Sequence, residues 1–161
     1  MTNTAEDKSL RRYQDVLYIV GTGIMAMGLW NSFKTVLFFT TGANGYAELG
    51  NDGVPRAVIV VTFVLIDIID LALRYYVCSH ARAEGLARTS EPQGNLYLVL
   101  AGFLALGHFV SVLLIAIAFT ELGDSQIESL ITAVMDLTLF WLMVYMIVAA
   151  VRIRKGGYHA G

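Results

Sequence analysis

Four long apolar stretches follow one another along the chain, separated by short polar segments. They run over residues 15–40, 55–79, 96–119 and 126–151. An α-helix rises about 1.5 Å per residue and the hydrocarbon core of a bilayer is about 30 Å thick, so about 20 residues suffice for one crossing. The connecting segments are too short to hold a second domain. The pattern therefore predicts an all-α fold, a single integral membrane four-helix bundle.

Residues typical of helix starts stand at the beginnings of three of these stretches. Pro55 suits the first turn of the second helix, and Asn95 suits the N-cap of the third. Ser125 and Glu128 have the spacing of a capping box at the start of the fourth. These signals agree with the boundaries that the apolar pattern predicts.

Basic residues are concentrated in alternate connecting segments. Three of them precede the first stretch, Lys8, Arg11 and Arg12, and two lie between the second and third stretches, Arg82 and Arg88. Three more follow the fourth stretch, Arg152, Arg154 and Lys155. The two other connections hold only Arg56. Because Lys and Arg remain on the cytoplasmic side of a membrane, both termini are predicted to be cytoplasmic, in a multi-pass protein of the cell membrane.

The composition supports a membrane protein and excludes several other classes. Hydrophobic residues make up 57% and charged residues 15% of the 161 residues, whereas soluble domains carry about 25% charged residues. A net charge of −2 without a basic patch argues against a nucleic-acid partner. The single cysteine, Cys78, excludes a disulfide within the chain and a metal site built from several cysteines.

The informative residues are the polar ones inside the apolar stretches, because a charge at membrane depth costs several kcal/mol. Helix rise places the charged ones about 9 to 21 Å from the predicted outer helix ends, so that all four helices contribute a polar group to one layer. We expect these residues to form an intramembrane polar cluster: Asn31, Lys34, Asp67, Asp70, His108, Ser111 and Asp136.

The charges of this cluster do not balance. Asp70 and Arg74 have the i, i+4 spacing of a helical ion pair. With Lys34 and Arg74 as the cations, Asp67, Asp70 and Asp136 leave one surplus negative charge, which favours uptake of a proton or a monovalent cation. The same cluster could instead serve only to fix the order and register of the helices.

A second group of polar residues follows the second stretch toward the cytoplasm. Arg74, Arg82 and Arg88 are expected to contact lipid headgroups there, Arg74 by extending its side chain toward the interface.

The sequence predicts a proton- or cation-coupled transporter or channel that works as a homo-oligomer. One alternative is a non-catalytic subunit or assembly factor of a larger membrane partner, and another is a protein that binds lipid headgroups. We expect no enzyme, because hydrolytic and nucleotide-binding motifs are missing. We also expect neither a metal nor another cofactor, since haem between two histidines needs a pair and only His108 lies at depth.

Overall fold

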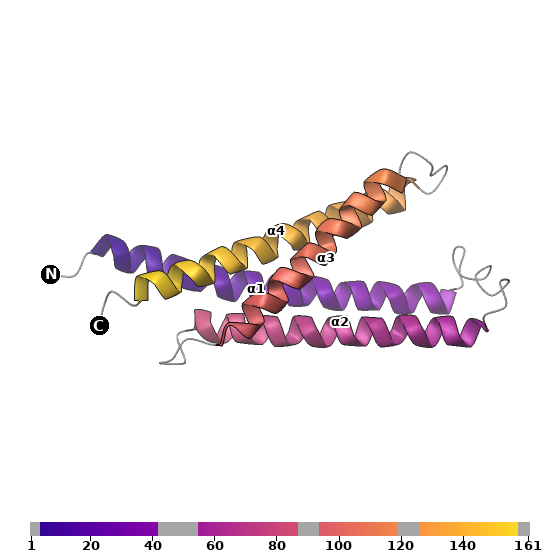
Figure 1. The fold of residues 1–161 in the computed structure, drawn as a ribbon, viewed down its shortest axis with the longest axis horizontal. Helices are drawn as coiled ribbons and strands as arrows, with labels where there is room; N and C mark the ends of the chain where they lie inside the picture. Colours follow the sequence, from indigo (N-terminus) through magenta and orange to yellow (C-terminus); the bar gives the residue numbers. More distant parts are fainter. Residues whose placement is uncertain (1–3, 42–54, 87–93, 119–125, 158–161) are drawn as a thin grey trace.

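The computed structural model describes residues 4–41, 55–86, 94–118 and 126–157. These residues form four helices, α1 (Thr4–Thr41), α2 (Arg56–Gly85), α3 (Leu96–Ala118) and α4 (Gln126–Gly157), and the described part of the chain contains no strand (Figure 1). The predicted all-α four-helix fold is confirmed.

Three of the helices are long and apolar enough to cross a membrane. These segments are Lys8–Leu37 in α1, Leu96–Ile117 in α3 and Ser129–Lys155 in α4. They fit a membrane protein. Although α2 is 30 residues long, it does not meet the same criterion, and it carries Asp67, Asp70 and Arg74. The four predicted crossings therefore find direct support in three helices.

The helices extend beyond the apolar stretches at the ends predicted to be cytoplasmic. α1 begins at Thr4, α2 continues to Gly85 and α4 continues to Gly157. Hydropathy marks where a helix enters the membrane, whereas the backbone hydrogen bonds continue through polar residues that favour helix.

The expected helix starts can be checked at two of three places. The carbonyl oxygen of Pro55 accepts from the backbone N–H of Val58 at 2.9 Å, and that of Asn95 accepts from the N–H of Leu98 at 3.1 Å. Pro55 therefore stands at the N-cap, just before the first turn in which it was expected, and Asn95 stands where predicted. Ser125 of the predicted capping box lies outside the described residues.

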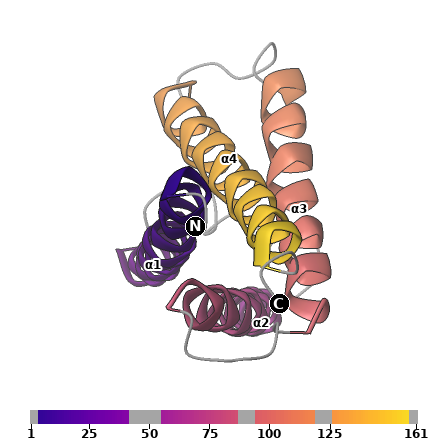
Figure 2. The same cartoon turned by 90° about the vertical axis from the view of Figure 1, so that its left-hand side faces the viewer.

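The helices form two antiparallel pairs that diverge. α1 lies against α2, α3 lies against α4, and α1 also packs on α4, while α2 has few contacts with α3 and α4 (Figures 1 and 2). The pairs are close together where α1 begins and α4 ends, which we call the terminal end. They separate toward the opposite end, which we call the far end (Figure 1).

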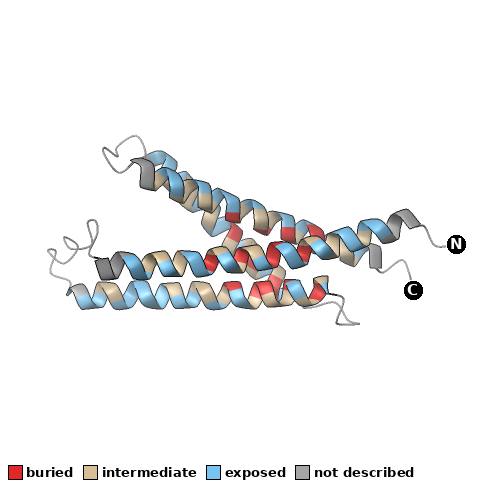
Figure 3. Ribbon diagram, turned by 180° about the vertical axis from the view of Figure 1, so that it is seen from behind, coloured by how far each residue is buried: buried red, intermediate tan, exposed pale blue. Residues whose placement is uncertain are grey.

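The apolar core occupies only the half of the molecule near the terminal end (Figure 3). Among the residues whose burial the structure describes, the buried hydrophobic side chains are Leu17, Val20, Ile24, Val77, Cys78, Ala81, Tyr97, Ala101, Ala105, Leu139, Met143, Met146, Ala149 and Ala150. Apolar side chains in the far half are half-buried or exposed, as expected for surfaces that face lipid or another protein.

Glycines allow α1 and α2 to approach closely. A Cβ atom on Gly85 would lie 2.8 Å from the backbone oxygen of Gln14 and 3.1 Å from Cβ of Leu17. A Cβ on Gly21 would lie 3.2 Å from Cγ of Arg82. Small residues at such contacts are the usual means by which helices pack in membranes.

Replacing Gly85 by alanine should therefore lower the thermal denaturation temperature of the detergent-solubilised protein. The added methyl group meets backbone atoms that cannot rotate away, and overpacking of this kind costs about 1–3 kcal/mol. Gly23→Ala is the matched control, because a Cβ there meets no atom within 4 Å and alanine favours helix. Equal denaturation temperatures for the two variants would show that the α1–α2 contact is not close at Gly85.

Candidate functional site

A cavity of about 520 Å³ lies between the two diverging helix pairs, and all four helices line it. We call it the central cavity. Its apolar lining includes Phe63, Ile66 and Leu104. Its polar lining residues are Asn31, Thr35, Asp67, Asp70, Arg74, His108, Ser111, Thr132 and Asp136.

The cavity begins where the apolar core ends. Arg74 is the buried residue of α2 nearest the far end, since none of residues 57–73 is buried. His108 follows the buried Ala105 by one turn, and Asp136 precedes the buried Leu139 by one turn. A polar layer therefore separates the packed terminal half from the open far half.

Arg74 lies at the centre of this layer, and its side chain is only 3% exposed. Its Nε donates to Oδ2 of Asp70 at 2.6 Å, and its Nη2 lies 2.8 Å from Nε2 of His108 on α3. Gly28 makes room for it on α1, because a Cβ there would lie 2.9 Å from Cδ of Arg74. The arginine thus links α2 to α3, and the missing side chain of Gly28 on α1 leaves room for it.

The expected ion pair between Asp70 and Arg74 is confirmed, but the expected contact of Arg74 with lipid headgroups is wrong. The expectation came from the distance of Arg74 to the end of its own helix. The side chain instead stays inside the bundle, where Asp70 and His108 bind it and Gly28 accommodates it.

Asp136 on α4 accepts two hydrogen bonds from α3. Nδ1 of His108 lies 2.9 Å from Oδ1, and the hydroxyl of Ser111 donates to Oδ2 at 2.5 Å. These three residues of the predicted cluster therefore contact one another. We call Asp70, Arg74, His108, Ser111 and Asp136 the central network.

The other predicted site residues occupy different positions. Asn31 and Asp67 line the central cavity. Lys34 is half-buried on α1, but the lining that the structure describes includes its neighbours Asn31 and Thr35 instead. Arg82 is exposed, with its guanidinium 5.1 Å from the ring centroid of Tyr18. Arg88 lies outside the described residues.

A second network, near the terminal end, was not predicted. Arg154 of α4 binds Glu84 of α2 with both side-chain arms, Nε to Oε1 at 2.9 Å and Nη2 to Oε2 at 3.0 Å. Tyr97 of α3 donates its hydroxyl to the same carboxylate, and Arg154 also donates to the side chain of Asn95. Glu84 is 8% exposed. We call Glu84, Asn95, Tyr97 and Arg154 the terminal network.

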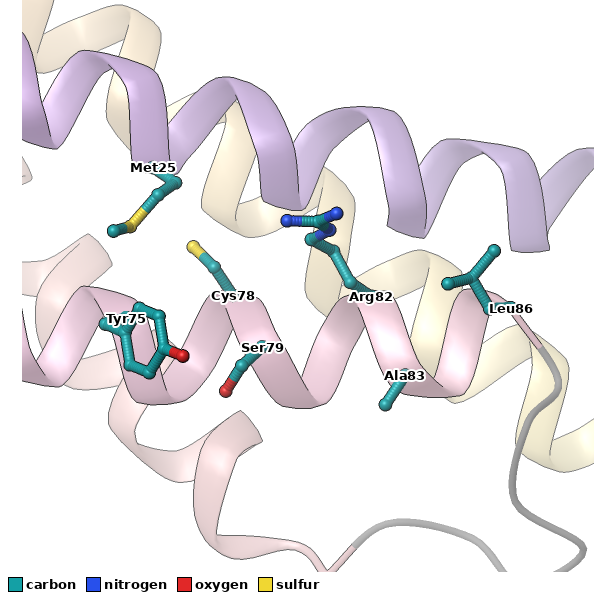
Figure 4. A pocket seen from close by; sticks show the side chains of 7 residues that line it. All are labelled: Met25, Tyr75, Cys78, Ser79, Arg82, Ala83 and Leu86. Atoms are coloured by element: carbon teal, nitrogen blue, oxygen red, sulfur yellow. The ribbon is translucent and has the colours of Figure 1, made fainter.

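A smaller cavity of about 240 Å³ lies beside α1 and α2 in the terminal half (Figure 4). Figure 4 shows Cys78 and Arg82 directed from α2 toward α1, with Met25 approaching from α1. Its only charged lining residue in the described part of the chain is Arg82. This cavity therefore lacks the mixture of acids and bases that distinguishes the central cavity.

Comparisons with known proteins add no relatives: no family model, no curated protein and no solved structure matches the chain. Among the described residues, no group of three or more His, Cys, Asp or Glu side chains is arranged to hold a metal ion.

Replacing Arg154 by methionine should destabilise the protein, because Glu84 would keep its charge in a buried position and lose its cation. Breaking one side of a buried ion pair costs about 3 kcal/mol or more. The measurement is the thermal denaturation temperature in detergent, with Arg152→Met as the control. Arg152 is exposed two residues before Arg154 on the same helix, so its replacement should change stability little. An equally small effect of both substitutions would contradict the structural role of the terminal network.

Proposed function

We propose that this membrane protein transports protons or monovalent cations through the central cavity, and that α2 crosses the membrane together with the other three helices. One observation supports this above all: the central cavity brings three carboxylates, a buried arginine and a histidine together from three helices. Ionisable residues at membrane depth that face a cavity are typical of ion pathways and proton relays.

The surface of α2 supports its crossing. Asp67, Asp70 and Arg74 line the central cavity, whereas apolar side chains such as Val61, Leu65 and Ile69 are more than half exposed. A helix that directs its charges inward and its apolar residues outward is suited to lipid. α2 also runs alongside α1, which is itself apolar enough to span (Figure 1).

The charge of the cavity favours cations over anions. Asp67, Asp70 and Asp136 contribute three negative charges when ionised, Arg74 contributes one positive charge, and the half-buried Lys34 next to the lining contributes a second, so one negative charge remains. In surroundings of low dielectric constant such an excess attracts a cation strongly. The excess of negative charge is the reason why we propose a cation rather than an anion.

The two halves of the molecule correspond to the closed and open sides of a pathway. From the central network toward the far end the helix pairs diverge. Toward the terminal end, the core and the terminal network hold α2, α3 and α4 together. Transport then requires the terminal half to open, with Glu84 and Arg154 as the contact that must break. Four helices alone enclose little space for a pathway that is closed on one side at a time, so the proposal includes that the transporter acts as a homo-oligomer.

A second candidate function rests on the continuity of the central network. Asp70, Arg74, His108 and Asp136 form an unbroken chain of hydrogen bonds over three helices. Such a chain could hold together a subunit or assembly factor that docks on a larger membrane protein. This candidate differs from the first in having no transport activity of its own.

The test is ion flux in proteoliposomes that contain only this protein, with gradients of H⁺, Na⁺ and K⁺ applied in turn. Asp136→Asn keeps the shape of the side chain and removes the charge that His108 and Ser111 bind, so flux should fall at least tenfold. Asp15→Asn is the control, because it removes the same charge from an exposed position on α1 and should leave flux unchanged.

The absence of flux from the unmodified protein would overturn the transport proposal. The structural candidate would then be supported if Asp136→Asn lowered the denaturation temperature and prevented copurification of a larger membrane protein. Equal flux in the unmodified protein and Asp136→Asn would show that ions do not pass through the central cavity.

A further inference from the structure

The hydrogen bond between Arg74 and His108 fixes the protonation of the histidine. A guanidinium group carries five N–H donors and no acceptor. Because Nη2 of Arg74 lies 2.8 Å from Nε2 of His108, that ring nitrogen must accept, and therefore carries no proton. The proton of the neutral ring is then on Nδ1, which donates to Oδ1 of Asp136 at 2.9 Å.

From this geometry we infer that the transported ion is the proton, and that its binding site is Nε2 of His108. This atom accepts a hydrogen bond from Arg74 whenever the proton is absent. The inference rests on the proposed function and adds to it the ion and the atom that receives it.

Proton and arginine exclude one another at this atom. A proton that enters from the central cavity adds to the lone pair of Nε2 and forms an N–H bond, and the hydrogen bond from Nη2 of Arg74 breaks. No electrons are transferred, and the ring becomes an imidazolium with both nitrogens as donors. The two cations would then face each other at hydrogen-bond distance, so Arg74 must move away.

Arg74 is placed so that it can move. Its Nη1 is buried without a hydrogen-bond partner among the described residues, which makes its present position less favourable than a fully satisfied one. Asp70 is on the same helix and can stay paired with Arg74 during the movement. The central cavity adjoins both side chains, and Asp67, which also lines it, can serve as an alternative acceptor.

The same contacts argue against a metal cation. A metal ion needs several oxygen ligands at once. Both oxygens of Asp136 already accept hydrogen bonds from α3, and Oδ2 of Asp70 is bound by Arg74. A proton needs one lone pair, and His108 supplies it.

The charged residues that line the cavity with His108, among those that the structure describes, come from two helices. α2 contributes Arg74, Asp70 and Asp67, and α4 contributes Asp136. From α1 the described lining consists of the uncharged Asn31 and Thr35, with Lys34 between them in the sequence. Once Arg74 has moved, the imidazolium is stabilised by Asp136, which keeps its hydrogen bond to Nδ1.

The first experiment observes the ring nitrogens directly, by ¹⁵N NMR of the full-length protein labelled at histidine and reconstituted in lipid nanodiscs. His108→Gln assigns the signals. The expected result is a neutral ring protonated on Nδ1 and unprotonated on Nε2. A neutral ring protonated on Nε2 would overturn the inference.

The second experiment removes the competing cation. In Arg74→Gln, at one fixed pH, the ¹⁵N spectrum should show a larger share of His108 rings protonated on both nitrogens than in the unmodified protein, because no guanidinium then binds Nε2. Arg82→Gln is the control, because Arg82 is an exposed arginine on the same helix outside the central cavity, and it should leave that share unchanged. Equal shares in the two variants would show that Arg74 does not compete with the proton.

Flux measurements distinguish failure of this inference from failure of the proposed function. Proton flux that is lost in His108→Gln and kept in His80→Gln supports both, since His80 lies outside the cavity lining and its Nδ1 bonds to the backbone oxygen of Tyr76. Flux of Na⁺ or K⁺ that depends on Asp136 but not on His108 would overturn the inference and leave the proposed function standing. No flux of any ion would overturn both.

Discussion

A guanidinium group that is withdrawn from water must find its charge and its hydrogen bonds within the protein, and Arg74 imposes this constraint on the whole structure. Asp70 supplies the counter-charge from the previous turn of α2, and His108 supplies an acceptor from α3. Gly28 supplies the space on α1. Asp136 on α4 is held in turn by His108. All four helices are therefore fitted to one side chain, at the level where the core ends and the central cavity begins.

The helical fold follows from the sequence because it depends on short-range properties. Residues 96–119 are apolar with one histidine, and α3 matches this stretch within one residue at its end. The apolar pattern does not predict how far a helix continues into polar residues, since α1 begins at Thr4 although its apolar part begins near Asp15. The divergence of the two helix pairs has no signal in the pattern, because lipid-facing and cavity-facing apolar residues look the same in a sequence.

The site was predictable where depth alone brings residues together. His108, Ser111 and Asp136 meet as their positions along α3 and α4 predict. Arg74 was misplaced because depth measured along one helix ignores what the neighbouring helices offer, here the gap at Gly28. The pairing of Glu84 with Arg154 joins residues far apart in the chain, and Arg152 and Lys155 are equally basic neighbours, so only the packing of α4 on α3 and α2 selects Arg154.

The pairing of Asp70 with Arg74 inside one helix bears on how the chain enters the bilayer during synthesis. α2 is made before His108 and Asp136 exist, so these partners cannot help it leave the aqueous translocation channel. The i, i+4 pair can form as soon as α2 is helical, and it neutralises two of the three charges in the apolar part of that helix. If α2 crosses the membrane, it can then insert as a hairpin with the preceding α1. The later helices α3 and α4 complete a network whose first bond, from Arg74 to Asp70, was made within a single helix.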